Sequence, residues 1–207
     1  MKLLKGPRPG QRLALFMVAL GANCLIACTQ PGATHFHARD ITGLLPDLQF
    51  QLTSGSGRAM AASDLQGKTT LLYFGYTHCP DACPMTLTYI DDALKRLGAE
   101  ASAVRVLFVS VDPGRDTPQV LQRYASSFGP QVVGLTGTDD QLTAVTKRYR
   151  VAYRRETPDA NGDYAVYHSS AVFVFDRAGR ARLLAAPSGP GDGLADDLRV
   201  LIGRHPQ

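Results

Sequence analysis

The sequence predicts an α/β fold in which a central mixed sheet is flanked by helices. Three observations support this. Residues 69–75 and 104–111 are continuous apolar runs, as expected for central strands that are covered on both faces. Between them, residues 83–97 carry apolar side chains at helical spacing. Strand, helix and strand form a βαβ unit, whose crossover should be right-handed.

A first strand is predicted at residues 48–52, where apolar and polar residues alternate. The residues Ser54-Gly-Ser-Gly57 are expected to turn the chain after it. The helix at 83–97 should end at Gly98, because glycine is favoured just beyond a helix C-terminus.

The second half of the chain supplies the remaining elements. Asp116-Thr-Pro118 should begin a helix, with Asp116 or Thr117 as its cap. The other expected elements are a helix at 139–149, a hairpin of 171–175 and 182–185, and a last helix at 194–203. This order is that of a thioredoxin-like fold, and we assign it to residues 41–207.

The N-terminus has the pattern of an export signal. Basic residues precede the apolar run 13–20, and Leu25-Ile-Ala-Cys28 follows, which resembles a bacterial lipobox. We therefore predict a lipoprotein signal peptide at 1–27, lipidation of Cys28 and a tether at 28–40. The protein would be membrane-anchored and face the periplasm. The alternative is an uncleaved membrane anchor, but this apolar run is short for a span of ~20 residues.

The net charge of +4 does not indicate a nucleic-acid partner. Four of the 22 basic residues precede Leu13, which leaves 18 against 18 acidic residues in the rest of the chain. A formally neutral body offers no electrostatic footprint for a polyanion.

Cys79 and Cys83 are the two cysteines within the predicted domain. Residues four apart share one face of a helical turn, so both sulfurs can converge on one point. A helix N-terminus also favours thiolates. Two thiolates suit a soft metal, with Cu(I) as the leading candidate, although a disulfide remains an alternative.

Two thiolates do not complete a stable site, and histidine is the commonest third ligand. The candidates beyond the cysteine segment are His35, His37, His168 and His205. His168 precedes the strand at 171–175 and is the most easily placed beside the cysteines. His78 adjoins Cys79 but should point away from the site, and Met85 is expected to fill the core.

At this point the chain resembles the Sco (SenC) family. The resemblance rests on Tyr73-Phe-Gly-Tyr-Thr-His-Cys-Pro-Asp-Ala-Cys-Pro84, Val111-Asp-Pro-Gly-Arg-Asp-Thr-Pro118, Gly134-Leu-Thr-Gly137 and the segment around His168. It implies a membrane-tethered, thioredoxin-like protein that delivers copper to the CuA centre of cytochrome c oxidase subunit II. It also implies one copper ion per chain, held by Cys79, Cys83 and His168. The family usually has Asp before this histidine, whereas this chain has Tyr167.

Three functions remain open at the level of sequence. A metallochaperone would need His168 as well as both cysteines, and another periplasmic copper chaperone would be its donor. A thiol–disulfide oxidoreductase acting on the cysteines of the CuA site would need Cys79 and Cys83 but not His168. A copper or redox sensor is the third. The loop with Asp112, Arg115 and Asp116 either serves turn chemistry alone or, as the resemblance suggests, borders the site.

Overall fold

Strands β4 (Thr69–Gly75) and β5 (Val104–Ser110) form the centre of an eight-stranded sheet with the order β1-β10-β9-β4-β5-β6-β2-β3. β4 pairs in parallel with β5, and β5 with β6 (Val132–Thr136). On the other side β4 pairs antiparallel with β9 (Val172–Phe175). The sheet is therefore mixed, as predicted, and every residue of β4 is buried.

The computed structural model describes residues 35–187 and 191–203. The predicted signal peptide and Cys28 lie outside these residues. Met1–His35 and Phe36–Gln207 form separate units, and the second contains the sheet. The other strands of this second unit are β1 (Arg39–Asp40), β2 (Gln51–Ser54), β3 (Ala59–Ala61), β7 (Tyr153–Arg155), β8 (Val166–His168) and β10 (Ala181–Ala185). Its helices are α2 (Ala82–Leu97), α3 (Pro118–Ser126), α4 (Asp139–Arg148) and α5 (Asp192–Gly203), with short 3-10 turns at Ala62–Leu65 and Gly98–Ala103.

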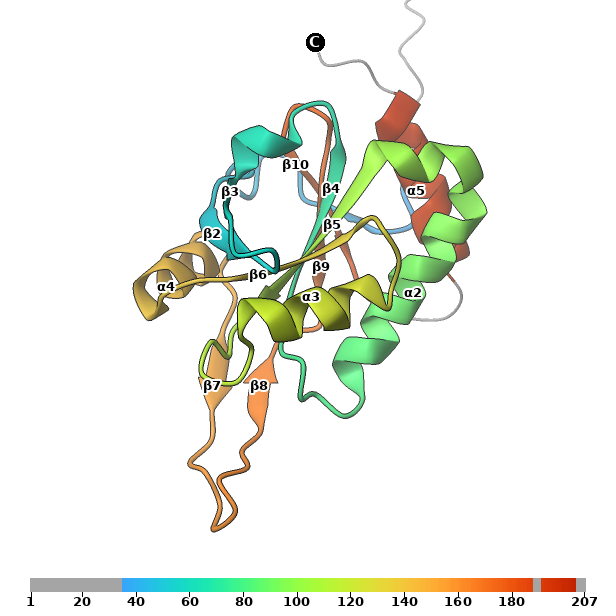
Figure 1. Ribbon diagram of the computed structural model, residues 1–207. Helices are drawn as coiled ribbons and strands as arrows, with labels where there is room; N and C mark the ends of the chain where they lie inside the picture. The colour runs from blue at the N-terminus through green and yellow to red at the C-terminus, as the bar shows by residue number, and fades with distance from the viewer. Residues whose placement is uncertain (1–34, 188–190, 204–207) are drawn as a thin grey trace, which may run out of the picture. The chain divides into compact units, whose positions relative to one another are not determined.

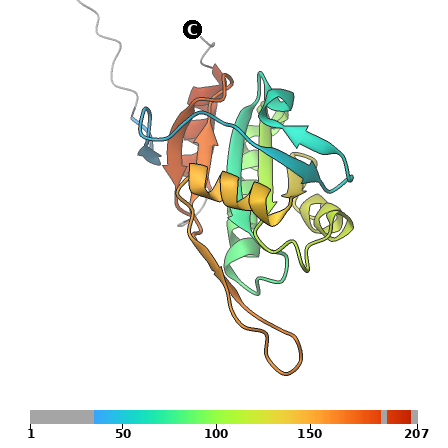
Figure 2. The same ribbon diagram turned by 90° about the vertical axis from the view of Figure 1, so that its left-hand side faces the viewer.

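Helices cover both faces of the sheet, which gives the three-layer arrangement expected from the sequence. α2 packs against α5 on one face, and α4 lies on the opposite face (Figures 1 and 2). α2 ends at Leu97, and Gly98 follows with a φ of +59°. Apolar side chains from both faces of β4, β5 and β9 form one core with the buried stripe of α2.

Some elements differ from the prediction. The strand expected at 48–52 is displaced to Gln51–Ser54, where it pairs with β3 and β6. β6 was not predicted as a strand, because Gly134 interrupts its apolar run. A Cβ atom at Gly134 would lie 2.9 Å from Cβ of Leu121, so glycine here allows α3 to pack closely on β6.

β7 and β8 form a separate two-stranded sheet, the 153–168 hairpin, which was not predicted either. Tyr153 pairs with His168, and Arg154 pairs with Tyr167. The hairpin projects from the body at the end where the loop from β4 to α2 lies (Figures 1 and 2). This places His168 at the same end of the molecule as the two cysteines.

The segment just before the predicted domain is attached to it. Arg39 and Asp40 form β1, which pairs with β10. The buried carboxylate of Asp197 in α5 accepts hydrogen bonds from the backbone N–H groups of His37 and Ala38, both at 2.8 Å. Among the described residues, no helix has the length and hydrophobicity that crossing a bilayer requires.

Candidate metal centre

The loop between β4 and α2 carries both cysteines. Cys79 is half-buried in the loop, and Cys83 is fully buried in the first turn of α2. The backbone N–H of Cys83 donates to Sγ of Cys79 at 3.3 Å. Both cysteines are free thiols. The four-residue spacing thus directs both sulfurs to one side of the helix N-terminus.

Gly75 makes room for this arrangement. A Cβ atom at this position would lie 2.8 Å from Sγ of Cys83 and 2.6 Å from Cε2 of Phe108. Only a residue without a side chain leaves Cys83 space to point inward beneath the end of β4.

His168 completes a three-residue cluster. Its Nε2 atom lies 3.2 Å from Sγ of Cys83. The ligand atoms of Cys79, Cys83 and His168 all lie within 4.8 Å of one another, a spacing that suits one metal ion. Two sulfurs and one imidazole nitrogen form a donor set that favours soft or borderline metals such as copper.

The imidazole of His168 is oriented by a backbone group and two aromatic rings. Its Nδ1 atom hydrogen bonds to the carbonyl oxygen of Ser169 at 3.0 Å, which leaves Nε2 free to face the sulfurs. The rings of Tyr73 and Tyr76 contact the imidazole edge-to-face, with centroids 6.1 and 5.9 Å away. The Ser169 carbonyl therefore orients the imidazole in this chain, where Tyr167 precedes His168.

Burial controls the protonation of the cluster. It raises the pKa of the Cys83 thiol to about 12, although contacts with Tyr73 and the backbone of Tyr76 act in the other direction. This is opposite to the lowering expected from a helix N-terminus. Burial also lowers the pKa of His168, and the Ser169 carbonyl partly opposes this change. Without a metal, Cys83 is therefore a neutral thiol beside a neutral imidazole at pH 7.

The 111–117 loop, which follows β5, contacts the loop that carries the cysteines. Thr117 caps α3 by accepting a hydrogen bond from the N–H of Val120. Asp116 has a different role: it is buried and accepts hydrogen bonds from the N–H and hydroxyl of Thr77, at 2.9 and 2.5 Å. Of the two caps considered from sequence, Thr117 is the one observed.

Other residues considered from the sequence lie outside the cluster. The His78 side chain is about half exposed, with Nδ1 3.6 Å from a carboxylate oxygen of Asp116. The prediction that Met85 fills the core was wrong. Met85 is 64% exposed, because it lies on the face of α2 opposite the buried stripe. Nε2 of His37 lies 3.9 Å from a carboxylate oxygen of Asp196.

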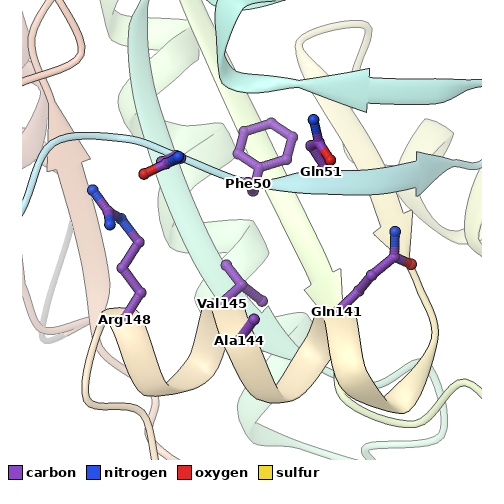
Figure 3. A pocket seen from close by; sticks show the side chains of 7 residues that line it. Phe50, Gln51, Gln141, Ala144, Val145 and Arg148 are labelled. Carbon is purple, nitrogen blue, oxygen red and sulfur yellow. The ribbon is translucent and has the colours of Figure 1, made fainter.

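A groove between α4 and the chain before β2 is separate from this cluster. Its volume is about 370 Å3. It is lined by Gln49, Phe50, Gln51, Gln141, Ala144, Val145 and Arg148 (Figure 3). It contains none of the three cluster residues, so we base the functional assignment on the cluster alone.

Comparisons with known proteins agree with this geometry. The sequence model of the family described as SCO1/SenC matches residues 44–203. The mitochondrial SCO2 homolog of Bos taurus is 40% identical over 132 residues, which are 63% of this chain and 50% of that protein. The chain thus matches about half the length of this relative.

Two solved structures with copper bound are also similar. ScoI of Bradyrhizobium japonicum is 38% identical, with a TM-score of 0.70 over 75% of this chain and 99% of that one. ScoI of Arabidopsis thaliana is 32% identical, with a TM-score of 0.68 over 75% of this chain and 97% of that one.

Proposed function

Because the chain belongs to the SCO1/SenC family, we propose that it is a copper metallochaperone that binds one copper ion through Cys79, Cys83 and His168. The observation that carries this proposal is the convergence of two thiols and one imidazole within 4.8 Å. Copper in the solved structures of two relatives supports the choice of metal.

The chemistry of the three residues suits a metal ion that is bound and later transferred. Cu(I) binding displaces the Cys83 proton, and the neutral imidazole offers Nε2 without losing one. Cys79 is the more accessible of the two sulfurs. It is therefore the group through which an incoming acceptor ligand would begin exchange.

We propose the CuA centre of cytochrome c oxidase subunit II as the acceptor, and another periplasmic copper chaperone as the donor. The family resemblance supports the acceptor. The lipobox-like Leu25-Ile-Ala-Cys28 supports a lipid anchor at Cys28 and a periplasmic location.

The test uses the reduced full-length chain loaded with Cu(I). Cys79→Ala, Cys83→Ala and His168→Ala should each lose most of the copper after desalting, as measured by metal analysis. His78→Ala is the matched control, because His78 adjoins the cysteines but lies outside the cluster, and it should retain one ion per chain. Stoichiometric copper in His168→Ala would refute the three-ligand site.

A second function, thiol–disulfide exchange with the acceptor, is favoured by the free thiol of half-buried Cys79 beside Cys83. The two functions differ in whether they require His168. Incubation with the oxidised apo domain of subunit II would show whether electrons move. Reduction of that domain by metal-free His168→Ala at the wild-type rate would support the reductase, whereas metal transfer that requires His168 would support the chaperone.

A further inference from the structure

The two halves of the candidate metal centre are held by a third segment that contributes no ligand. The cysteines come from the loop between β4 and α2, and His168 comes from the 153–168 hairpin. The 111–117 loop lies between them and hydrogen bonds to both. Its start continues the pairing of β4 with β5, because the N–H of Val111 donates to the carbonyl of Gly75 at 2.9 Å.

Asp116 connects this loop to the cysteines. Its carboxylate is fully buried and accepts three hydrogen bonds, two from Thr77 and one from the Ser110 hydroxyl at 2.5 Å. Thr77 precedes Cys79 by two residues. A buried carboxylate with this many donors is fixed in place, and it therefore fixes the backbone of the cysteine loop.

Asp112 connects the same loop to the hairpin. Its buried carboxylate accepts hydrogen bonds from Nε of Arg115 and from the hydroxyl of Tyr164, both at 2.6 Å. Tyr164 lies four residues before His168. A second contact holds the hairpin, since Nε of Arg155 donates to the carbonyl of Val111 at 3.0 Å.

Arg115 extends this connection to the imidazole. Its guanidinium carbon lies 3.6 Å from the centroid of the Tyr164 ring and 5.7 Å from that of the Tyr76 ring. The Tyr76 ring in turn contacts His168 edge-to-face. A continuous set of contacts thus runs from Asp112 to the His168 ring.

We propose that the 111–117 loop positions the metal centre, with Asp116 setting the cysteine loop through Thr77 and Asp112 setting His168 through Tyr164. Tyr164 is a positioning residue for His168, although it touches no ligand atom. This inference rests on the proposed copper site. It predicts that Asp116 and Asp112 act on different ligands, and that mutation can separate their effects.

The test removes single hydroxyl groups and keeps the side-chain shapes. Tyr164→Phe loses the hydrogen bond to Asp112 but keeps the ring beneath Arg115. Its Cu(I) affinity, measured on the full-length chain by competition with a colorimetric Cu(I) chelator, should fall at least about 10-fold. Tyr167→Phe is the matched control, because it removes an exposed hydroxyl beside His168, and its affinity should equal that of the wild type.

A double-mutant cycle separates positioning from a general effect on folding. In a His168→Ala background, Tyr164→Phe should change affinity by less than about twofold, because the ligand that it positions is absent. Thr77→Val removes the hydroxyl that binds Asp116 and should weaken copper binding in both backgrounds. Thr77→Ser keeps a hydroxyl and should bind copper like the protein with Thr77. The Cu(II) form of Tyr164→Phe should also lose the imidazole nitrogen coupling in pulsed electron paramagnetic resonance spectra.

Two results would overturn the inference. One is wild-type affinity and nitrogen coupling in Tyr164→Phe while His168→Ala binds weakly. The other is an equal loss from Tyr164→Phe in both backgrounds. If instead His168→Ala binds copper as well as the wild type, the proposed three-ligand site fails, and the role of Tyr164 in it fails as a consequence.

Discussion

The Nε2 atom of His168 lies 3.2 Å from Sγ of Cys83, although the two residues are 85 positions apart in the chain. The Nδ1–H of His168 is directed at the Ser169 carbonyl, so Nε2 is the acceptor and the Cys83 thiol is the donor. The metal-free site is thus closed by a neutral hydrogen bond, and a metal ion that enters must replace its proton.

The lowered pKa of His168 predicts a loss of stability in acid. As the pH falls below about 6.5, the ordinary pKa of histidine, the unfolded chain binds a proton at this residue before the folded chain does. The free energy of unfolding should therefore fall through this window until the folded-state pKa is reached. Urea unfolding of the metal-free protein at pH 7.5 and 5 would measure it. His168→Asn should show a smaller decrease, and an equal decrease in both proteins would contradict the prediction.

The two thiols should differ in reactivity. Cys79 is half-buried, whereas Cys83 is fully buried and its pKa is raised to about 12. Because thiolates are the reactive species, iodoacetamide at pH 7.5 should label Cys79 first and leave Cys83 unmodified until the protein unfolds. Peptide mass spectrometry of the reduced, metal-free protein would give the order. Faster labelling of Cys83 than of Cys79 would contradict the burial argument.

Gly75→Ala should destabilise the protein and disturb the metal site. The new Cβ would lie 2.8 Å from Sγ of Cys83 and 2.6 Å from Cε2 of Phe108. Overpacking of this kind costs about 1–3 kcal/mol. Gly203→Ala is the control, because no described atom beyond its chain neighbours and its own helix lies within 4 Å of its new Cβ. Chemical denaturation would compare the two variants, and equal stabilities would contradict the prediction.

Asp197→Asn should loosen the segment before β1. The carboxylate accepts two backbone N–H groups at 2.8 Å, and an asparagine would direct its NH2 group at one of them. A buried donor left without an acceptor costs about 1–3 kcal/mol. Hydrogen exchange of residues 36–40 should quicken, as measured by mass spectrometry. The exposed Asp140 in α4 gives the control Asp140→Asn, which should exchange in this segment like the wild type.

The central strands could be predicted because their side chains are apolar on both faces, as in β4 and β5. The 153–168 hairpin could not, because β7 consists of Tyr153, Arg154 and Arg155, a sequence typical of an exposed loop. Its strands form through pairing across a long connection and through contacts with the 111–117 loop. No local pattern encodes such contacts.

The candidate site was also predictable only in part. The spacing of Cys79 and Cys83 predicts that their sulfurs share one side of a helical turn, since both lie in one segment. The place of His168 depends on how the unpredicted hairpin packs, so the sequence indicated it only through its position before the strand at 171–175 and through the family resemblance. Tyr164 lies in that hairpin too, which explains why sequence reasoning missed it.

The hydrogen bond from His168 to Ser169 also bears on which oxidation state of copper the protein would keep. Two thiolates with Cu(I) carry a formal net negative charge, which Cu(II) would cancel. A carboxylate in contact with the imidazole would favour the more positive ion, but the acceptor here is an uncharged carbonyl. We therefore expect bound copper to have a higher reduction potential than a carboxylate in contact with the imidazole would give, a change that favours Cu(I) over Cu(II).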